Sequence, residues 1–221
     1  MVVLRINGVP RKVVVDDFFP LGHHNEMLCS YSSNKSELWI SLLEKAYMKG
    51  MDLRKNTLLM IFFFFGFNRI VTSHIFISVM GGYDFPGSNS NIDLYALTGW
   101  IPERTSIKQK DDSSFNKDEI FRKLFQRFHK GDVLVTLATG EMSDAEADRA
   151  GLVPTHAYAM LDIREVNGIR LFLLKNPWAH LRWKGNYSET DNRNWTPEMM
   201  KALSYDPKNA QNFDNGVFWV I

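Results

Sequence analysis

Apolar residues recur at helical spacing in two stretches of the chain. In SELWISLLEKAYMK they fall at positions 38, 39, 42, 43, 46 and 47, and polar residues take the opposite face. The second stretch follows Asn116, a favourable N-cap residue, and ends at Gly131. The pattern predicts helices over 37–49 and 117–130.

Strand signals occupy much of the remaining chain. Two β-branched runs, Val2 to Ile6 and Lys12 to Val15, flank the turn residues 7–10, and residues 132–139 form an apolar run typical of a buried strand. Asn167-Gly168 is the strongest hairpin signal, between runs at 156–166 and 169–175. We predict loops and short strands over the last fifty residues, anchored by Trp178, Trp183, Trp195 and Trp219.

A polar pair marks the two ends of this predicted hairpin. His156 begins it, Asn176 follows its last residue, and Trp178 lies two positions further on. A three-residue loop with Gly168 left-handed would set His156 opposite Trp178 and place Asn176 on the same face, on a diagonal. A two-residue turn would put the pair on opposite faces. The prediction that the two side chains meet therefore depends on the longer loop.

Histidine beside asparagine suits a catalytic base held by an orienting amide, with the Trp178 ring keeping water from their hydrogen bond. The alternative is a structural histidine at a strand start and an asparagine that ends a strand. The residues alone leave both interpretations open.

Charge and cysteine content exclude several functions. With 26 Lys and Arg against 25 Asp and Glu, the net charge of +1 gives no electrostatic case for binding nucleic acid or an anionic membrane. The single cysteine, Cys29, excludes an intramolecular disulfide framework and a cysteine-based zinc cluster. It fits a reducing compartment, and the N-terminus has no uninterrupted apolar segment of a secretory signal. We expect a cytoplasmic protein.

Residues 50–78 differ in composition from the segments on either side. They include an apolar run from Leu58 to Phe67, broken only by Gly66, and then Asn68 and Arg69. A membrane helix needs about 20 mostly apolar residues, and a charge near its centre opposes insertion. This stretch is therefore a poor candidate for a membrane span.

Several motifs, taken in order and spacing, resemble one protease family. They are Glu37-Leu38-Trp39 with LLEKAY, Leu97-Thr98-Gly99, His156-Ala157-Tyr158-Ala159, Lys175-Asn176-Pro177-Trp178, Trp183-Lys184-Gly185 and Asp214-Asn215-Gly216-Val217-Phe218-Trp219. Together they resemble the second half of the catalytic core of calpain cysteine proteases (peptidase C2), in the branch that contains the PalB-like enzymes.

The resemblance implies an α+β fold: the β-rich second half of a papain-like, calpain-type core, built on a twisted antiparallel sheet or open barrel. It implies that His156 is the histidine of a Cys-His-Asn triad, that Asn176 orients it and that Trp178 shields the pair. It also implies hydrolysis of peptide bonds in protein or peptide substrates, by a thiolate that attacks the carbonyl.

The family's nucleophile is missing from this match. It stands in a GDCW-like segment upstream of the region that the chain resembles, as does the glutamine of the oxyanion hole, and Cys29 has neither flanking motif. We expect a partial catalytic domain over 1–221, inactive without a Cys-bearing partner half. The alternatives are a non-catalytic pseudo-protease or binding module, and a membrane-anchored fragment held through 57–78.

Two further departures concern the insertion and calcium. Without residues 50–78 the chain matches the family with no gap, so we interpret them as an in-frame retained intron. Conventional calpains, which depend on calcium, have a carboxylate where Arg182 stands, and a cation there would repel the ion, although Glu189 keeps a carboxylate nearby. We expect no metal and no cofactor in this half.

Overall fold

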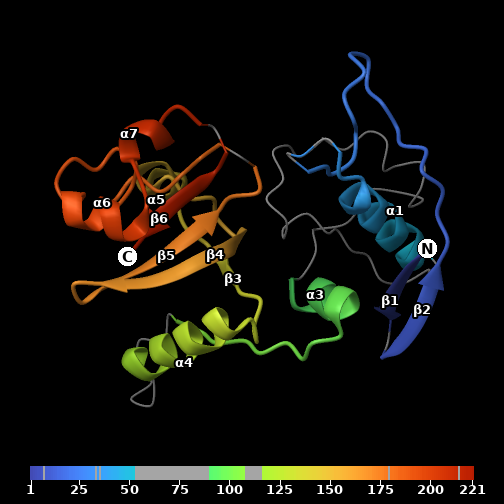
Figure 1. Cartoon of the computed structure of the whole chain (residues 1–221), viewed down its shortest axis with the longest axis horizontal. Coiled ribbons are helices and arrows are strands. Elements are labelled where there is room, and N and C mark those ends of the chain that lie inside the picture. The colour runs from blue at the N-terminus through green and yellow to red at the C-terminus, as the bar shows by residue number, and fades with distance from the viewer. Residues whose placement is uncertain are drawn as a thin grey trace. The chain divides into compact units, whose positions relative to one another are not determined.

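The computed structural model describes residues 1–6, 8–32, 34, 36–52, 90–107, 116–178, 180–213 and 215–221. The chain forms two compact units, residues 1–105 and 106–221 (Figure 1). The predicted insertion at 50–78 lies outside the described residues except for its first three, as does the whole stretch 57–78 proposed as an anchor. Within the described ranges, no helix has the length and apolar character needed to cross a membrane.

The first unit packs a β-hairpin against two helices. Strands β1 (Val2–Ile6) and β2 (Val9–Val13) pair antiparallel, and α1 (Trp39–Asp52) and α3 (Ser90–Thr98) lie against them. Its core consists of Leu4, Ile6, Val13, Ala46, Tyr47 and Ala96. The second strand begins earlier than predicted because Gly8, at φ +75°, allows a tighter turn. Helix α1 continues three residues beyond its predicted end.

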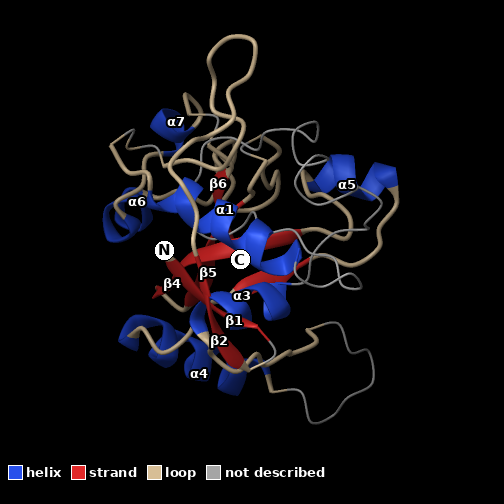
Figure 2. Ribbon diagram, turned by 90° about the vertical axis from the view of Figure 1, so that its right-hand side faces the viewer, coloured by secondary structure: helices blue, strands red, loops and turns tan. Residues whose placement is uncertain are grey.

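The second unit is built on a four-stranded antiparallel sheet. The strand order is β3 (Thr136–Ala138), β4 (Ala157–Val166), β5 (Ile169–Lys175) and β6 (Val217–Val220). Its helices are α4 (Lys117–Lys130), α5 (Asp144–Ala150), α6 (Pro197–Leu203) and α7 (Pro207–Ala210). Figure 2 shows these strands in red and the helices beside them in blue.

Apolar side chains cover both faces of this sheet. One face packs beneath α4 through Phe121, Tyr158, Met160, Ile163, Leu174 and Phe218. The other face packs beneath α6 and the loop before it, through Leu171, Tyr187, Trp195, Met199 and Trp219. Figures 1 and 2 both show α4 and α6 on opposite sides of the sheet. Helices with antiparallel sheets, and no closed barrel among the described strands, confirm the α+β class.

The helix predicted after Asn116 has the predicted bounds. Asn116 accepts hydrogen bonds from two backbone N–H groups, and Gly131 ends the helix at φ +76°. The run 132–139 is wrong as a buried strand, because only three residues pair and none is fully buried. The C-terminal prediction of loops and short strands missed α6 and α7.

Candidate functional site

The turn of the long hairpin differs from the prediction. Val166 pairs with Ile169, so the loop has two residues, Asn167 and Gly168, both in the left-handed region at φ +53° and +77°. This turn follows the right-handed twist of the strands, which is why Asn-Gly favours it. The three-residue loop over 166–168 is therefore wrong. With this turn alone, His156 and Asn176 would lie on opposite faces.

A β-bulge in β4 returns His156 and Asn176 to the same face of the sheet. Asp162 pairs with Leu173 and Met160 with Leu174, so Leu161 has no partner in the ladder. The extra residue shifts the pairing by one position. Continued beyond the end of β5, the shifted register sets His156 opposite Trp178 and brings Asn176 to its side of the sheet.

The His156 ring and the Asn176 amide form a hydrogen bond of 2.9 Å between Nε2 and Oδ1. Asn176 Nδ2 donates to the carbonyl oxygens of His180, at 3.0 Å, and Leu181, at 2.9 Å. The Trp178 backbone N–H donates to Oδ1 at 3.0 Å. These contacts fix which end of the amide is the oxygen, so His156 Nε2 must donate. In the neutral ring the lone pair is then on Nδ1.

Thr139, just beyond β3, holds the backbone of His156. The His156 N–H donates to Thr139 Oγ1 at 2.9 Å, and the Thr139 N–H donates to the His156 carbonyl at 2.9 Å. The Thr139 hydroxyl in turn donates to the Val153 carbonyl at 2.6 Å. Sequence reasoning missed this residue, because a single threonine after a short strand has no distinguishing pattern.

Aromatic rings enclose the imidazole. The Trp178 ring lies 4.4 Å from the His156 ring, centroid to centroid, and the Tyr158 ring meets it edge-on at 5.0 Å. His156 is 8% exposed and Asn176 is fully buried, whereas Trp178 is 40% exposed. Burial lowers the pKa of His156, and the bond to Asn176 opposes this shift in part. The folded environment therefore favours the neutral imidazole.

Cys29 lacks the exposure and the lowered pKa that a nucleophilic cysteine needs. It is buried in the first unit, and burial is the main cause that raises the pKa of its thiol. Reactive cysteines are partly exposed and have lowered pKa values, so this environment favours an inert thiol.

Arg182 forms a buried ion pair near the same loop. Its Nε lies 3.0 Å from Glu189 Oε1, and its Nη1 donates to the carbonyl oxygens of Ala210, at 3.0 Å, and Phe213, at 2.9 Å. In the part of the chain that the structure describes, no group of three or more His, Cys, Asp or Glu side chains is arranged to hold a metal ion.

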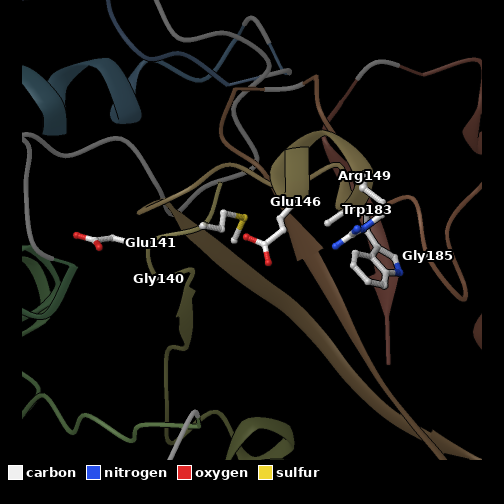
Figure 3. A pocket seen from close by; sticks show the side chains of 8 residues that line it. Gly140, Glu141, Glu146, Arg149, Trp183 and Gly185 are labelled. Carbon is white, nitrogen blue, oxygen red and sulfur yellow. The ribbon is translucent and has the colours of Figure 1, made fainter. Parts of the chain in front are cut away.

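A cavity of about 500 Å³ lies next to the segment of Thr139, because Gly140, the following residue, lines it. It is lined by Gly140, Glu141, Met142, Glu146, Arg149, Ala150, Trp183 and Gly185. In Figure 3, Glu146 and Arg149 extend from α5, the Trp183 ring lies close to Arg149, and Glu141 points away from this group. Its position beside the segment that holds His156 makes this cavity a candidate site for a substrate side chain.

Comparisons with known proteins match the motifs described above. Residues 2–57 and 78–221 match the calpain family of cysteine proteases. Calpain-7 of Mus musculus is 58% identical over 220 residues, which cover all of this chain and 23% of that protein. Human Calpain-7 gives the same values. The Calpain-like protease palB of Emericella nidulans is 35% identical over 218 residues, or 97% of this chain and 20% of that protein.

The chain spans only 20–23% of the length of these three relatives. The unmatched residues 58–77 fall inside the stretch 50–78, whose origin as a retained intron stays a prediction. The match includes both His156 and Asn176, and the relatives belong to the Calpain-7 and PalB branch that the motifs predicted. On this evidence, the chain belongs to the calpain family of cysteine proteases.

Proposed function

We propose that this chain supplies the histidine and the asparagine of a Cys-His-Asn triad in a calpain-type endopeptidase that cleaves proteins or peptides. The observation that carries the proposal is the 2.9 Å hydrogen bond between His156 Nε2 and Asn176 Oδ1. It joins a base to an orienting amide, within the region that matches the protease family.

In this mechanism, His156 Nδ1 takes the proton of a cysteine thiol. The resulting thiolate attacks the scissile carbonyl, and the imidazolium then protonates the leaving amine. Asn176 keeps the ring in one orientation and one tautomer. The Trp178 ring shields that hydrogen bond from water. Because burial favours the neutral ring, the thiolate has to stabilise the imidazolium.

The nucleophile in this proposal is not Cys29, because that thiol is buried and its pKa is raised. A Cys-bearing half of the catalytic core would supply it, so these 221 residues alone do not cleave peptides. Without a thiolate the covalent route is lost, and what remains of the triad gives little acceleration. A reducing compartment keeps a thiol nucleophile from oxidising, and we propose the cytoplasm.

A graft tests the proposal. Residues 106–221 replace the matching part of mouse Calpain-7, and peptide cleavage is measured against the unmodified host. We expect the graft to cleave, and His156→Ala to lower kcat/KM by about 10²-fold to 10⁴-fold because the general base is removed.

The matched control is His129→Ala, which removes a half-exposed histidine from α4 of the same unit and should leave cleavage unchanged. Cleavage by the His156→Ala graft at the rate of the original graft would refute the catalytic role. Turnover by the purified 221-residue chain, abolished by His156→Ala, would refute its inactivity alone.

A further inference from the structure

The loop after Asn176 is held in an unfavourable conformation. The carbonyl oxygens of His180 and Leu181 accept both hydrogen bonds from the Asn176 amide, and they fix its orientation. Leu181 has φ +66°, in the left-handed region that residues with a branched side chain rarely adopt. Such a conformation persists only when surrounding contacts enforce it.

Arg182 provides contacts of this kind, because it directly follows Leu181. Its guanidinium meets three oxygens, one from the Glu189 carboxylate and two from the carbonyls of Ala210 and Phe213. The Arg182 and Glu189 side chains are only 15% and 10% exposed. A buried planar cation with several directed hydrogen bonds restricts a loop more strongly than a solvent-exposed ion pair does.

The C-terminal segment that Arg182 binds also contacts the backbone of Asn176. Beyond Phe213, the Gly216 carbonyl accepts the Asn176 backbone N–H at 2.8 Å. The Asn215 carbonyl accepts from Lys175 Nζ at 2.7 Å. Arg182 thus joins the loop that orients the Asn176 side chain to the segment that holds the Asn176 backbone.

We propose that Arg182 is a positioning residue that acts as a built-in cation and keeps the Asn176–His156 pair aligned without calcium. The calcium ion of conventional calpains does not fit beside it: the guanidinium already binds three oxygens and would repel a second cation, although the buried Glu189 Oε2 has no hydrogen-bond partner among the described residues. That Arg182 supports catalysis rests on the proposed function. That Arg182 keeps the His156–Asn176 hydrogen bond aligned does not.

The test follows the ring nitrogens of His156 by NMR in the full chain, with the resonances assigned by comparison with His156→Gln. In the wild type we expect the Nε2–H tautomer and a slowly exchanging Nε2 proton. Arg182→Ala should abolish that protected proton signal and mix the two tautomers. Arg182→Lys keeps the charge but not the fork of donors, so it should speed the exchange of the proton while the fold is retained.

Two additions and one control complete the test. Guanidinium ions at concentrations below those that denature should restore the Nε2 signal in Arg182→Ala, and equal sodium chloride should not. Neither calcium nor excess EGTA should alter the His156 signals of the wild type. Arg164→Ala, which removes an exposed arginine paired with Asp162 in β4, should leave them unchanged.

Unchanged His156 signals in both Arg182 variants would overturn the proposal, as would wild-type signals that depend on calcium. In the Calpain-7 graft, Arg182→Lys should lower kcat more than it changes KM. If His156→Ala proves harmless in that graft, the proposed function fails while the NMR result on alignment still stands.

Discussion

At the scale of single residues, His156 is controlled by the amide beside it. Asn176 is fully buried, and its side chain contacts the His156 ring, two loop carbonyls and the Trp178 N–H. An amide with this many partners cannot rotate without leaving buried groups unpaired, which is unfavourable by about 1–3 kcal/mol for each group. Asn176 therefore sets the tautomer of His156 as well as its position.

The lowered pKa of His156 predicts a pH dependence of stability. The ordinary value is 6.5, and the folded value lies below it because burial disfavours the charged ring. Between the two values the unfolded chain binds a proton that the folded chain does not. The free energy of unfolding should therefore fall as the pH drops through 6.5, and level off below the folded pKa.

Urea denaturation over a pH series measures this dependence in the full chain. His156→Gln should remove that part of the slope. A variant with the same pH dependence as the wild type would contradict the burial effect on His156.

Glu44 in α1 predicts the opposite dependence in the first unit. Its Oε2 accepts the Ser30 N–H, whereas its buried Oε1 has no hydrogen-bond partner among the described residues. Burial raises its pKa from 4.5 to about 7, so the folded chain holds a proton that the unfolded chain loses. Stability should fall as the pH rises from 4.5 towards 7, and then level off.

Glu44→Gln keeps an acceptor for Ser30 without the charge. At about 1.4 kcal/mol for each pKa unit, we expect it to raise the free energy of unfolding by on the order of 3 kcal/mol above pH 7. Near pH 4.5 the gain should vanish. A gain of equal size at both pH values would exclude a titrating carboxyl as its source.

At the scale of elements, predictability followed the strength of the local pattern. The strands that flank Asn167-Gly168 and the helix after Asn116 appear where the sequence predicted them, because turn and cap residues act locally. The bulge at Leu161 could not be predicted. Residues 157–161 are all apolar, and a continuous apolar run has no alternation with polar residues from which to detect a shift in register.

Helices α5, α6 and α7 were missed for a different reason. They have only seven, seven and four residues, too few for a helical period to show. Each start nevertheless carries a sequence signal: Ser143 and Glu146 form a capping box at α5, and Thr196-Pro197 and Asp206-Pro207 place an N-cap residue before a proline at α6 and α7. Docking on the sheet stabilises α6, through Met199, more than its intrinsic propensity does.

The bulge predicts an unusual tolerance to a deletion. Because Leu161 has no ladder partner, removing it lets Asp162 follow Met160 directly in a regular ladder, with the pairs to Leu174 and Leu173 and their faces unchanged. We expect the deletion to change the free energy of unfolding by no more than about 1 kcal/mol and to keep the His156 tautomer.

Deletion of Leu173 from the unbulged partner strand is the matched control. It changes the length equally but breaks the register before Asn176, so it should destabilise far more and release the His156–Asn176 bond. Urea denaturation and the ring NMR signals measure both effects. Equal losses from the two deletions would refute the assigned bulge.

At the scale of the whole molecule, one unit carries every described residue of the candidate site. Segments far apart in sequence meet around Asn176, including Thr139 through His156, and Arg182 with Ala210 and Phe213. Close packing tightens these connections, since the Arg182 carbonyl would lie only 2.0 Å from a Cβ at Gly151. The family resemblance marked His156 and Asn176, but long-range contacts of this kind have no local sequence pattern.

Because Arg182 and Glu189 form a buried pair, we expect the loss of one partner to lower the free energy of unfolding more than the loss of both. Arg182→Met leaves a buried carboxylate and two carbonyls without their cation, so it should lower the free energy of unfolding by about 3–5 kcal/mol. The double variant Arg182→Met, Glu189→Gln removes both charges and should lose much less. Urea denaturation of the single and double variants measures the coupling, and additive losses would contradict a buried pair.

The central claim is that His156 serves as the base for a thiol supplied by another part of the protein. The most direct measurement is the pH dependence of alkylation of the nucleophilic cysteine in the Calpain-7 graft, with and without His156→Gln. An imidazolium beside the thiol should keep alkylation fast well below pH ~8.5, the ordinary pKa of cysteine, and His156→Gln should return the profile to that value. Identical profiles in the two proteins would contradict the claim.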